Sequence, residues 1–185
     1  MMTDPTAPRA SQQGRSSTVP AGDREVVARQ LGRLPRALVA VAHRCPCGQP
    51  DVVETAPRLD DGTPFPTLYY LTCPRASAAA SRLESAGRMK QWQDDLATDP
   101  GLAADYRAAH EAYLATRDAA ARPGEAVLET RATAGGMPDR VKCLHALAGH
   151  SLAAGAGVNP VGDRAVAEMG QWWSRGPCAQ LEDPA

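Results

Sequence analysis

Nearly all of the cysteine and histidine in this 185-residue chain is concentrated in three short stretches. They are HRCPCGQP from His43 to Pro50, DGTPFPTLYYLTCP from Asp61 to Pro74, and GGMPDRVKCLHALAGH from Gly135 to His150. A thiolate metal site and a cysteine active site both need a preset geometry around a deprotonated sulfur, and turns rich in glycine and proline can provide it. We therefore expect the fold to gather these stretches around one site.

The length and net charge of the chain limit the classes of protein to which it can belong. A domain usually takes about 100 to 200 residues, so the chain suits one domain. Its 20 basic and 21 acidic residues give a net charge of −1, without the basic surplus that nucleic acid or an anionic membrane attracts. The longest fully apolar run, Ala37 to Ala42, is too short to span a bilayer, and the first thirty residues lack the apolar segment of a secretory signal. We expect a cytoplasmic protein that binds neither nucleic acid nor membrane.

The chain has five cysteines, which is an odd number. In a reducing cytoplasm we expect no disulfides, so each cysteine should be a free thiol or a metal ligand. Cys178 lies in a polar segment rich in glycine and proline, and we expect it to be a free thiol. The other four are Cys45, Cys47, Cys73 and Cys143.

Composition divides the chain into three parts. Residues 1–22 are rich in Ser, Thr, Pro, Gly and Gln and almost lack large apolar side chains, so they cannot offset the entropy cost of ordering. We expect a disordered tail over 1–22, a single globular domain over 23–173 and a flexible C-terminal tail over 174–185.

The first part of the domain reads as a short helix followed by a small antiparallel sheet. Asp23 is the expected N-cap of the helix, which ends at Gly32. The Asp-Gly turn and the prolines of DGTPFP suit the connection between two strands. The predicted strands are Leu38–Ala42, Val52–Thr55 and Thr67–Thr72, and they place Cys45 and Cys73 near strand ends.

The rest of the domain reads as helical, which gives an α+β fold with the sheet packed on a mainly helical C-terminal part. Apolar residues recur at three- or four-residue spacing from Pro74 to the Asp99-Pro100 break, and again up to Pro123-Gly124. Residues 123–134 are predicted to be a mobile loop. A third helix is expected from Pro138 to near Gly155, and a fourth is expected to be capped by Asp163.

The cysteines and histidines predict a metal site of the Cys3His type. Cys45 and Cys47 lack the two-residue spacing of a zinc knuckle, but Cys73 ends a strand that could pair beside the one leading to Cys45. Cys143 and one histidine of the third helix would complete a zinc site. The alternative is structural, because cysteine is often a small core residue and histidine on a helix is often a packing residue.

Helical phase decides which histidine is expected as the ligand. If the helix is regular from Pro138, His150 shares a face with Cys143, whereas His145 is rotated about 160° away. His150 is therefore the predicted ligand. His145 is the alternative if the chain around Cys143 is not yet helical.

Gly135, Gly136, Arg140 and Lys142 form a second, weaker pattern. A helix start preceded by glycines can present free N–H groups to an anion, which predicts a phosphate or carboxylate site. Asp139 opposes this, because its charge already satisfies the helix dipole, and a flexible hinge is the simpler explanation. The chain has no nucleotide-binding glycine motif, no hydrolase nucleophile elbow and no Glu-x-x-His, so standard nucleotide, hydrolase and di-iron sites are not expected.

Three blocks of the chain resemble the actinobacterial protein family of unknown function number 501 (DUF501). The blocks are DGTPFPTLYYLTCP, SRLESAGRM and GGMPDRVKCLHALAGHSLAAGAGVNPVGD, and the resemblance covers about Arg29 to Ala167. It implies no activity, but it implies that Cys45, Cys73, Cys143 and His145 belong to the family's signature blocks. Cys47 and Cys178 are not part of that pattern.

Two classes of function follow. The first is a cytoplasmic metal-binding protein that holds zinc through cysteine and histidine, with the question of enzymatic activity left open. The second, which the resemblance implies through genes for a division protein and an exopolyphosphatase that often lie nearby, is an adaptor or regulator. It would bind a protein partner or polyanion in cell-envelope or polyphosphate physiology, and its cysteines would be structural.

Overall fold

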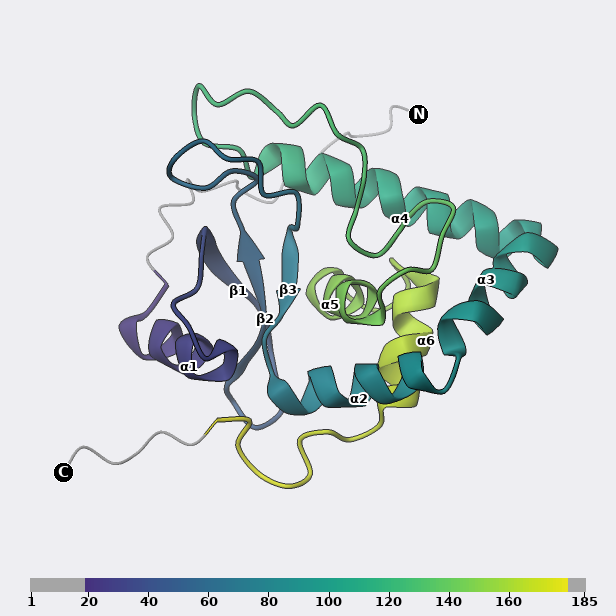
Figure 1. Cartoon of the computed structure of the whole chain (residues 1–185), viewed down its shortest axis with the longest axis horizontal. Coiled ribbons are helices and arrows are strands. Elements are labelled where there is room, and N and C mark those ends of the chain that lie inside the picture. Colours follow the sequence, from purple (N-terminus) through teal and green to yellow (C-terminus); the bar gives the residue numbers. More distant parts are fainter. Residues whose placement is uncertain (1–18, 180–185) are drawn as a thin grey trace, which may run out of the picture.

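The protein is α+β, as the sequence predicts. The structure, a computed structural model, describes residues 19–179. Residues 1–18 and 180–185 of the tails expected over 1–22 and 174–185 lie outside the described residues. The described chain forms one three-stranded antiparallel sheet and six helices (Figure 1). The strands are β1 (Leu38–Arg44), β2 (Pro50–Thr55) and β3 (Tyr69–Leu71), and the helices are α1 (Ala21–Leu31), α2 (Pro74–Ser85), α3 (Arg88–Thr98), α4 (Pro100–Ala119), α5 (Leu144–Ala154) and α6 (Pro160–Met169).

The sheet has the order β1-β2-β3, with β2 in the centre. All six residues of β2 are buried, as expected for a strand covered on both faces. A tight turn joins β1 to β2: the Cys45 N–H donates to Gln49 O at 2.9 Å, and the Gly48 N–H donates to Cys45 O at 2.8 Å. Gly48 has a φ of 87°, which suits a residue without a Cβ. The strands thus end in a rigid turn that carries Cys45 and Cys47.

The helices cover both sides of this sheet. Figure 1 shows α1 on one side and α5 on the other, with α2 and α4 on either side of α5. Helix α5 is buried along most of its length because it contacts the sheet, α2 and α6. Leu144 and Leu147 of α5 are fully buried in the common core. The position of α5 therefore depends on its contacts with the sheet, with α2 and with α6.

Two helix starts differ from the prediction. Helix α1 begins at Ala21, with Pro20 and not Asp23 as the N-cap residue. The helix expected from Pro74 to Asp99 is two helices, because Gly87 adopts a φ of 81° between α2 and α3. Glycine reaches this left-handed region without strain, so the chain turns there despite continuous apolar spacing.

The third helix begins at Leu144, not at Pro138. The N–H groups of Arg140 and Lys142 donate to the carbonyls of Gly136 and Gly135 at 3.0 and 2.9 Å, so these residues form turns. Cys143 is the N-cap residue of α5, with extended backbone. Cys143 therefore lies before the helix, and helical phase does not apply to it.

The cap of the last helix also differs from the prediction. Asn159, not Asp163, is the N-cap of α6 and accepts the Gly162 N–H at 2.9 Å. Asp163 instead accepts the Ser151 hydroxyl and the Gly157 N–H, which links α6 to the end of α5.

The described part of the C-terminal segment, residues 174–179, packs against the domain. Gln49 donates to Ala179 O at 2.6 Å and accepts the Ala179 N–H at 2.7 Å. Arg75 donates to Gly176 O at 2.5 Å, and Cys178 is buried. The expectation of a flexible tail is not met up to Ala179, because the segment forms hydrogen bonds with the turn after β1 and the start of α2.

The crossing of α5 and α6 depends on Gly162. A Cβ on this residue would collide with Leu147 O and come within 2.9 Å of the Ser151 Cβ. Gly162→Ala should therefore lower the free energy of unfolding by about 1 to 3 kcal/mol, the usual cost of overpacking. Gly22→Ala is the matched control, because Gly22 also lies in a helix and nothing lies within 4 Å of its added Cβ.

Urea denaturation measures both variants. Gly22→Ala should leave stability unchanged or raise it by up to about 1 kcal/mol, from helix propensity alone. A Gly162→Ala protein as stable as the Gly22→Ala protein would show that α5 and α6 do not approach as closely as described.

Candidate functional site

Three cysteine sulfurs converge at the turn between β1 and β2. Cys178 Sγ lies 3.4 Å from Cys47 Sγ and 3.5 Å from Cys45 Sγ. All three sulfurs lie within 4.8 Å of one another. Such distances are too long for a disulfide, whose S–S bond is about 2.05 Å, and all five cysteines are free thiols. The cluster joins residues 133 positions apart in the chain.

Cys73 adds a fourth sulfur next to this group. It is the N-cap residue of α2, fully buried, and its Sγ accepts the Ala76 N–H at 3.5 Å. Cys73 does not belong to the group whose sulfurs all lie within 4.8 Å of one another, but it is close enough to Cys178 to contribute to the raised pKa of the Cys178 thiol. We call Cys45, Cys47, Cys73 and Cys178 the four-cysteine cluster.

The thiols of the cluster differ in pKa. Burial raises the pKa of Cys45 to about 11, and burial together with the neighbouring thiols raises the pKa of Cys178. Burial works in the same direction at Cys47, but hydrogen bonds from the Gln49 backbone and from both neighbouring thiols lower its pKa below the ordinary value. Cys47 is therefore the thiol most ready to give up its proton.

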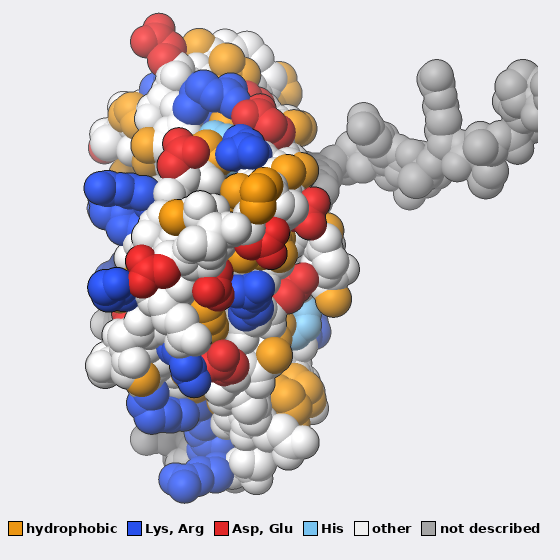
Figure 2. Space-filling view, turned by 90° about the vertical axis from the view of Figure 1, so that its right-hand side faces the viewer, with side chains coloured by type: hydrophobic (Ala, Val, Ile, Leu, Met, Phe, Trp, Pro, Cys, Tyr) orange, Lys and Arg blue, Asp and Glu red, His pale blue; other side chains and the backbone are white. Residues whose placement is uncertain are grey.

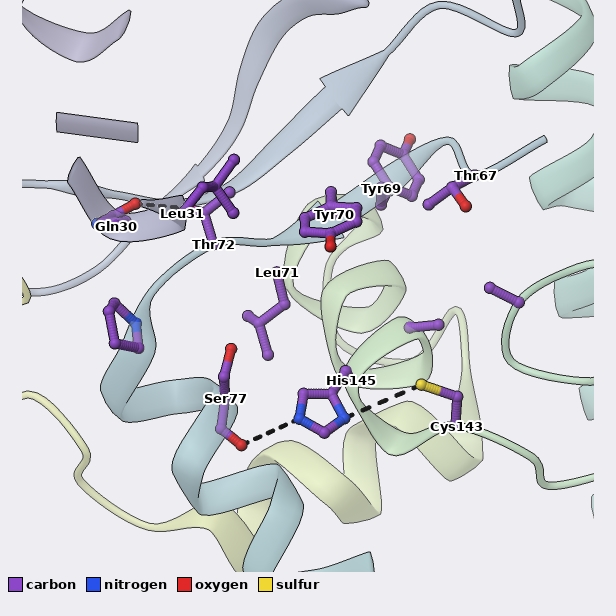
Figure 3. A pocket seen from close by; sticks show the side chains of 13 residues that line it. Gln30, Leu31, Thr67, Tyr69, Tyr70, Leu71, Thr72, Ser77, Cys143 and His145 are labelled. Atoms are coloured by element: carbon purple, nitrogen blue, oxygen red, sulfur yellow. Dashed lines mark hydrogen bonds between the residues drawn. The ribbon is translucent and has the colours of Figure 1, made fainter. Parts of the chain in front are cut away.

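Cys143 belongs to a different cluster, with His145 and Glu84. His145 Nδ1 lies 3.9 Å from Cys143 Sγ and 3.1 Å from Glu84 Oε1. The other ring nitrogen, Nε2, lies 3.1 Å from Ser77 O and 3.2 Å from Ser81 Oγ. Figure 3 shows the imidazole between Ser77 of α2 and Cys143 at the start of α5.

The electrostatics of this second cluster favour an ion pair. The hydrogen bond with Cys143 raises the pKa of His145 to about 9, against the effect of burial and with a further contribution from Glu84. Burial raises the pKa of Cys143, but hydrogen bonds from His145 and from the Ala146 backbone outweigh it, so the net shift is downward. The imidazolium is the favoured form of His145 at neutral pH, and the Cys143 thiol gives up its proton more readily than an ordinary cysteine.

A pocket of about 450 Å³ opens beside Cys143 and His145. Its walls come from the end of α1, from β3 with its flanking residues, from the start of α2 and from the start of α5. It is the size of a small-molecule site, which usually takes about 300 to 1,000 Å³. The four-cysteine cluster does not line this pocket.

His150, the expected fourth ligand, lies away from both clusters. Its ring stacks on Tyr69 at a centroid distance of 5.9 Å, and its Nδ1 lies 3.0 Å from Asn159 Nδ2. Burial lowers the pKa of His150 to about 4, so the ring is neutral. His150 is a packing residue between the sheet and α6.

The structure therefore divides the predicted Cys3His ligands among three places. Cys45 and Cys73 lie in the four-cysteine cluster, Cys143 lies with His145, and His150 lies in the core. The prediction joined the three cysteines because each lies beside a turn or a helix start, and it chose His150 because it extended the helix back to Pro138. Sequence reasoning left out Cys47 and Cys178, although the CPCG turn and a thiol in a Gly-Pro-Cys segment were visible signals. Glu84 lies in the block SRLESAGRM that carries the family resemblance, but no spacing in the sequence pointed to its role.

The predicted anion site does not take the expected form. Because the N–H groups of Arg140 and Lys142 donate to Gly136 and Gly135, they are not available to an anion. The side chains of Arg140 and Lys142 are exposed. On the face in Figure 2, acidic and basic side chains are interspersed over most of the surface. Among residues 19–179, no helix is long and apolar enough to cross a membrane.

Comparison with known proteins gives one match. A family model described as "Protein of unknown function (DUF501)" matches residues 41–167. This is more than half of the chain, so the chain belongs to that family, and the expected resemblance is confirmed over these residues. No curated protein and no solved structure matches. The matched range contains Cys45, Cys47, Cys73 and the whole second cluster, and Cys178 lies beyond it.

The buried, neutral His150 predicts a dependence of stability on pH. Its pKa of about 4 in the folded state lies below the value of about 6.5 for an unfolded chain, so the unfolded state binds the extra proton first. The stability from His150 is complete above pH 6.5 and is lost as the pH falls toward 4. A shift of this size corresponds to about 3 kcal/mol.

Urea denaturation at pH 7 and pH 4 checks this. Relative to the unaltered protein, His150→Gln should lose about 3 kcal/mol less between the two pH values. Equal losses for both proteins would show that His150 is not held neutral in the core.

Proposed function

We propose that this member of the DUF501 family binds one zinc ion through the four-cysteine cluster, and that the ion is structural. The observation that carries the proposal is the approach of Cys178 Sγ to Cys45 and Cys47 at 3.5 and 3.4 Å. Zinc bound to four sulfurs at about 2.3 Å in tetrahedral geometry needs sulfurs about 3.8 Å apart. Small side-chain adjustments would bring the Cys47–Cys178 and Cys45–Cys178 distances to that value, and the Cys73 side chain would have to move toward the other three sulfurs.

Backbone N–H groups around the sulfurs support this proposal. Cys73 Sγ accepts the Ala76 N–H, and the backbone N–H groups of Cys47 and Gln49 act to lower the pKa of the Cys45 and Cys47 thiols, respectively. Zinc binds thiolates, and N–H donors stabilise the negative charge of a thiolate. Cysteines that were only core residues would have no need of such donors.

The position of the cluster suggests what the ion does. It would connect the turn after β1, the start of α2 and the C-terminal segment, three regions otherwise joined by the hydrogen bonds of Gln49 and Arg75. Four protein sulfurs leave no open coordination position, which is typical of structural and not catalytic zinc. Free thiols also suit a reducing compartment, so we propose the cytoplasm as the location.

Metal content and thermal unfolding of the full chain, purified without an affinity tag, test the proposal. We expect about one zinc per chain, as in closed structural sites. At free zinc about 1,000-fold above the dissociation constant, chelation should remove about 4 kcal/mol of stability and lower the melting temperature by about 10 °C.

Cys47→Ser should abolish zinc binding, and Cys47 is the most suitable variant because it is the most exposed member of the cluster. Cys143→Ser is the matched control and should keep the zinc, because Cys143 lies in the other cluster. A protein that contains no metal and unfolds at the same temperature with and without chelator would contradict the proposal. In that case the cysteines are packing residues.

The second candidate function, binding of a polyanion by an adaptor or regulator, is favoured by one observation. Arg75, Arg82 and Arg175 line a surface pocket of about 520 Å³ that has no acidic residue in its lining. Trp172 also lines it, and its buried Nε1 has no hydrogen-bond partner. By contrast, the pocket beside Arg140 and Lys142 contains Asp139. Among the described residues, the arginine pocket is thus the better place for an anion.

Polyphosphate binding at two salt concentrations tests this candidate. Arg82→Ala with Arg175→Ala should weaken binding, and the effect should be stronger at low salt. The reason is that at 0.1 M salt the attraction between exposed charges is largely screened beyond about 10 Å. Arg140→Ala with Lys142→Ala removes the same charge elsewhere and is the matched control. Equal weakening by both double variants would indicate a diffuse charge effect and would exclude the pocket.

A further inference from the structure

The second cluster, formed by Cys143, His145 and Glu84, has a geometry that a zinc ion in the four-cysteine cluster does not explain. His145 presents both ring nitrogens to acceptors: Nε2 faces the Ser77 carbonyl at 3.1 Å and Nδ1 faces the Glu84 carboxylate at 3.1 Å. A carbonyl and an ionised carboxylate can only accept, so the ring must donate from both sides. A doubly protonated imidazolium therefore fits this position.

Glu84 holds the ring and the start of α5 together. Its Oε1 also accepts the Leu144 N–H at 2.7 Å, which is one of the N–H groups that a helix start leaves without a helical partner. His145 and Glu84 side chains are 30% and 24% exposed, so the group is neither in bulk solvent nor sealed in the core. The imidazolium is thus oriented by two elements, α2 and α5.

Cys143 lies beside this cation and next to the pocket. Its Sγ is 3.9 Å from His145 Nδ1, a distance that suits a cysteine and its base before substrate binds. Cys143 is also the N-cap residue of an 11-residue helix, whose partial positive charge favours a thiolate. Its side chain is partly exposed, and both Cys143 and His145 are among the pocket-lining side chains drawn in Figure 3.

We propose that Cys143 is a catalytic nucleophile, with His145 as its acid and base, and that the site hydrolyses a small neutral ester or thioester. Glu84 is a positioning residue that acts through His145. This site is separate from the proposed zinc site and shares no residue with it.

The pocket lining defines the class of substrate. Tyr69, Tyr70, Leu31 and Leu71 provide apolar surface, and Thr67 and Thr72 add hydroxyl groups. No Lys, Arg, Asp or Glu is among the lining residues, so the pocket offers a charged substrate no fixed counter-charge apart from His145. An uncharged acyl compound with an aromatic or short aliphatic group therefore suits it.

Water is the only co-reactant that this reaction needs. The Cys143 thiolate forms a C–S bond with the acyl carbon, the bond to the leaving oxygen or sulfur breaks, and the His145 Nδ1 proton passes to the leaving group. Neutral His145 then takes a proton from water, and the resulting hydroxide attacks the thioester. The C–S bond breaks, the carboxylic acid leaves, and the thiolate and imidazolium are restored.

Hydrolysis of 4-nitrophenyl acetate by the full chain tests the proposal. We expect a burst of nitrophenolate, an acetyl group mapped to Cys143 by mass spectrometry, and slow turnover. Cys143→Ala should abolish both, and His145→Gln should reduce deacylation by about 100-fold or more, the usual contribution of a general base. Glu84→Ala should reduce it as well, and Glu84→Gln, which keeps an acceptor oxygen, should restore most of it.

Two controls keep the test decisive. Lys142→Ala changes a residue next to Cys143 that does not line the pocket, and it should leave the reaction unchanged. If Cys143→Ala does not fold, alkylation of the unaltered protein by iodoacetamide, mapped to Cys143, should block the burst. Acetylation at another residue, a burst that survives this alkylation, or a second zinc ion that Cys143→Ala removes would each overturn the proposal.

Discussion

The contact among the cysteine sulfurs is the interaction on which the rest of the structure depends. Cys45 and Cys47 lie in the turn that joins β1 to β2, Cys73 begins α2, and Cys178 comes from the far end of the described chain. Hydrophobic burial alone does not select one arrangement of thiols, because it has no direction. A tetrahedral ion would select one, and would fix α2 against the sheet.

The position of α2 in turn determines the second cluster. Cys73 caps its first turn, Ser77 follows one turn later, and Glu84 lies near its end. Ser77 and Glu84 are the residues that hold His145 and the start of α5. The two cysteine clusters are thus different in chemistry, one closed and one open to a pocket, but the same helix aligns both.

The sequence was sufficient for the strands and the class of fold, and insufficient for the sites. Alternating and apolar runs are local signals, so Leu38–Arg44 and Pro50–Thr55 could be predicted within a few residues. The start of α5 could not, because the turns before it depend on hydrogen bonds from Arg140 and Lys142 back to two glycines. Because this helix was predicted to begin at Pro138 and not at Leu144, helical phase favoured His150 over His145 as the ligand. Cys178 was missed because its burial comes from contacts with residues about 130 positions earlier.

X-ray absorption at the zinc edge tests the central claim most directly, because it reports the atoms bound to the metal without any substitution. The account predicts a single shell of four sulfur atoms at about 2.3 Å. A shell that contains nitrogen or oxygen at about 2.0 to 2.1 Å would contradict it, since the described four-cysteine cluster contains no histidine or carboxylate.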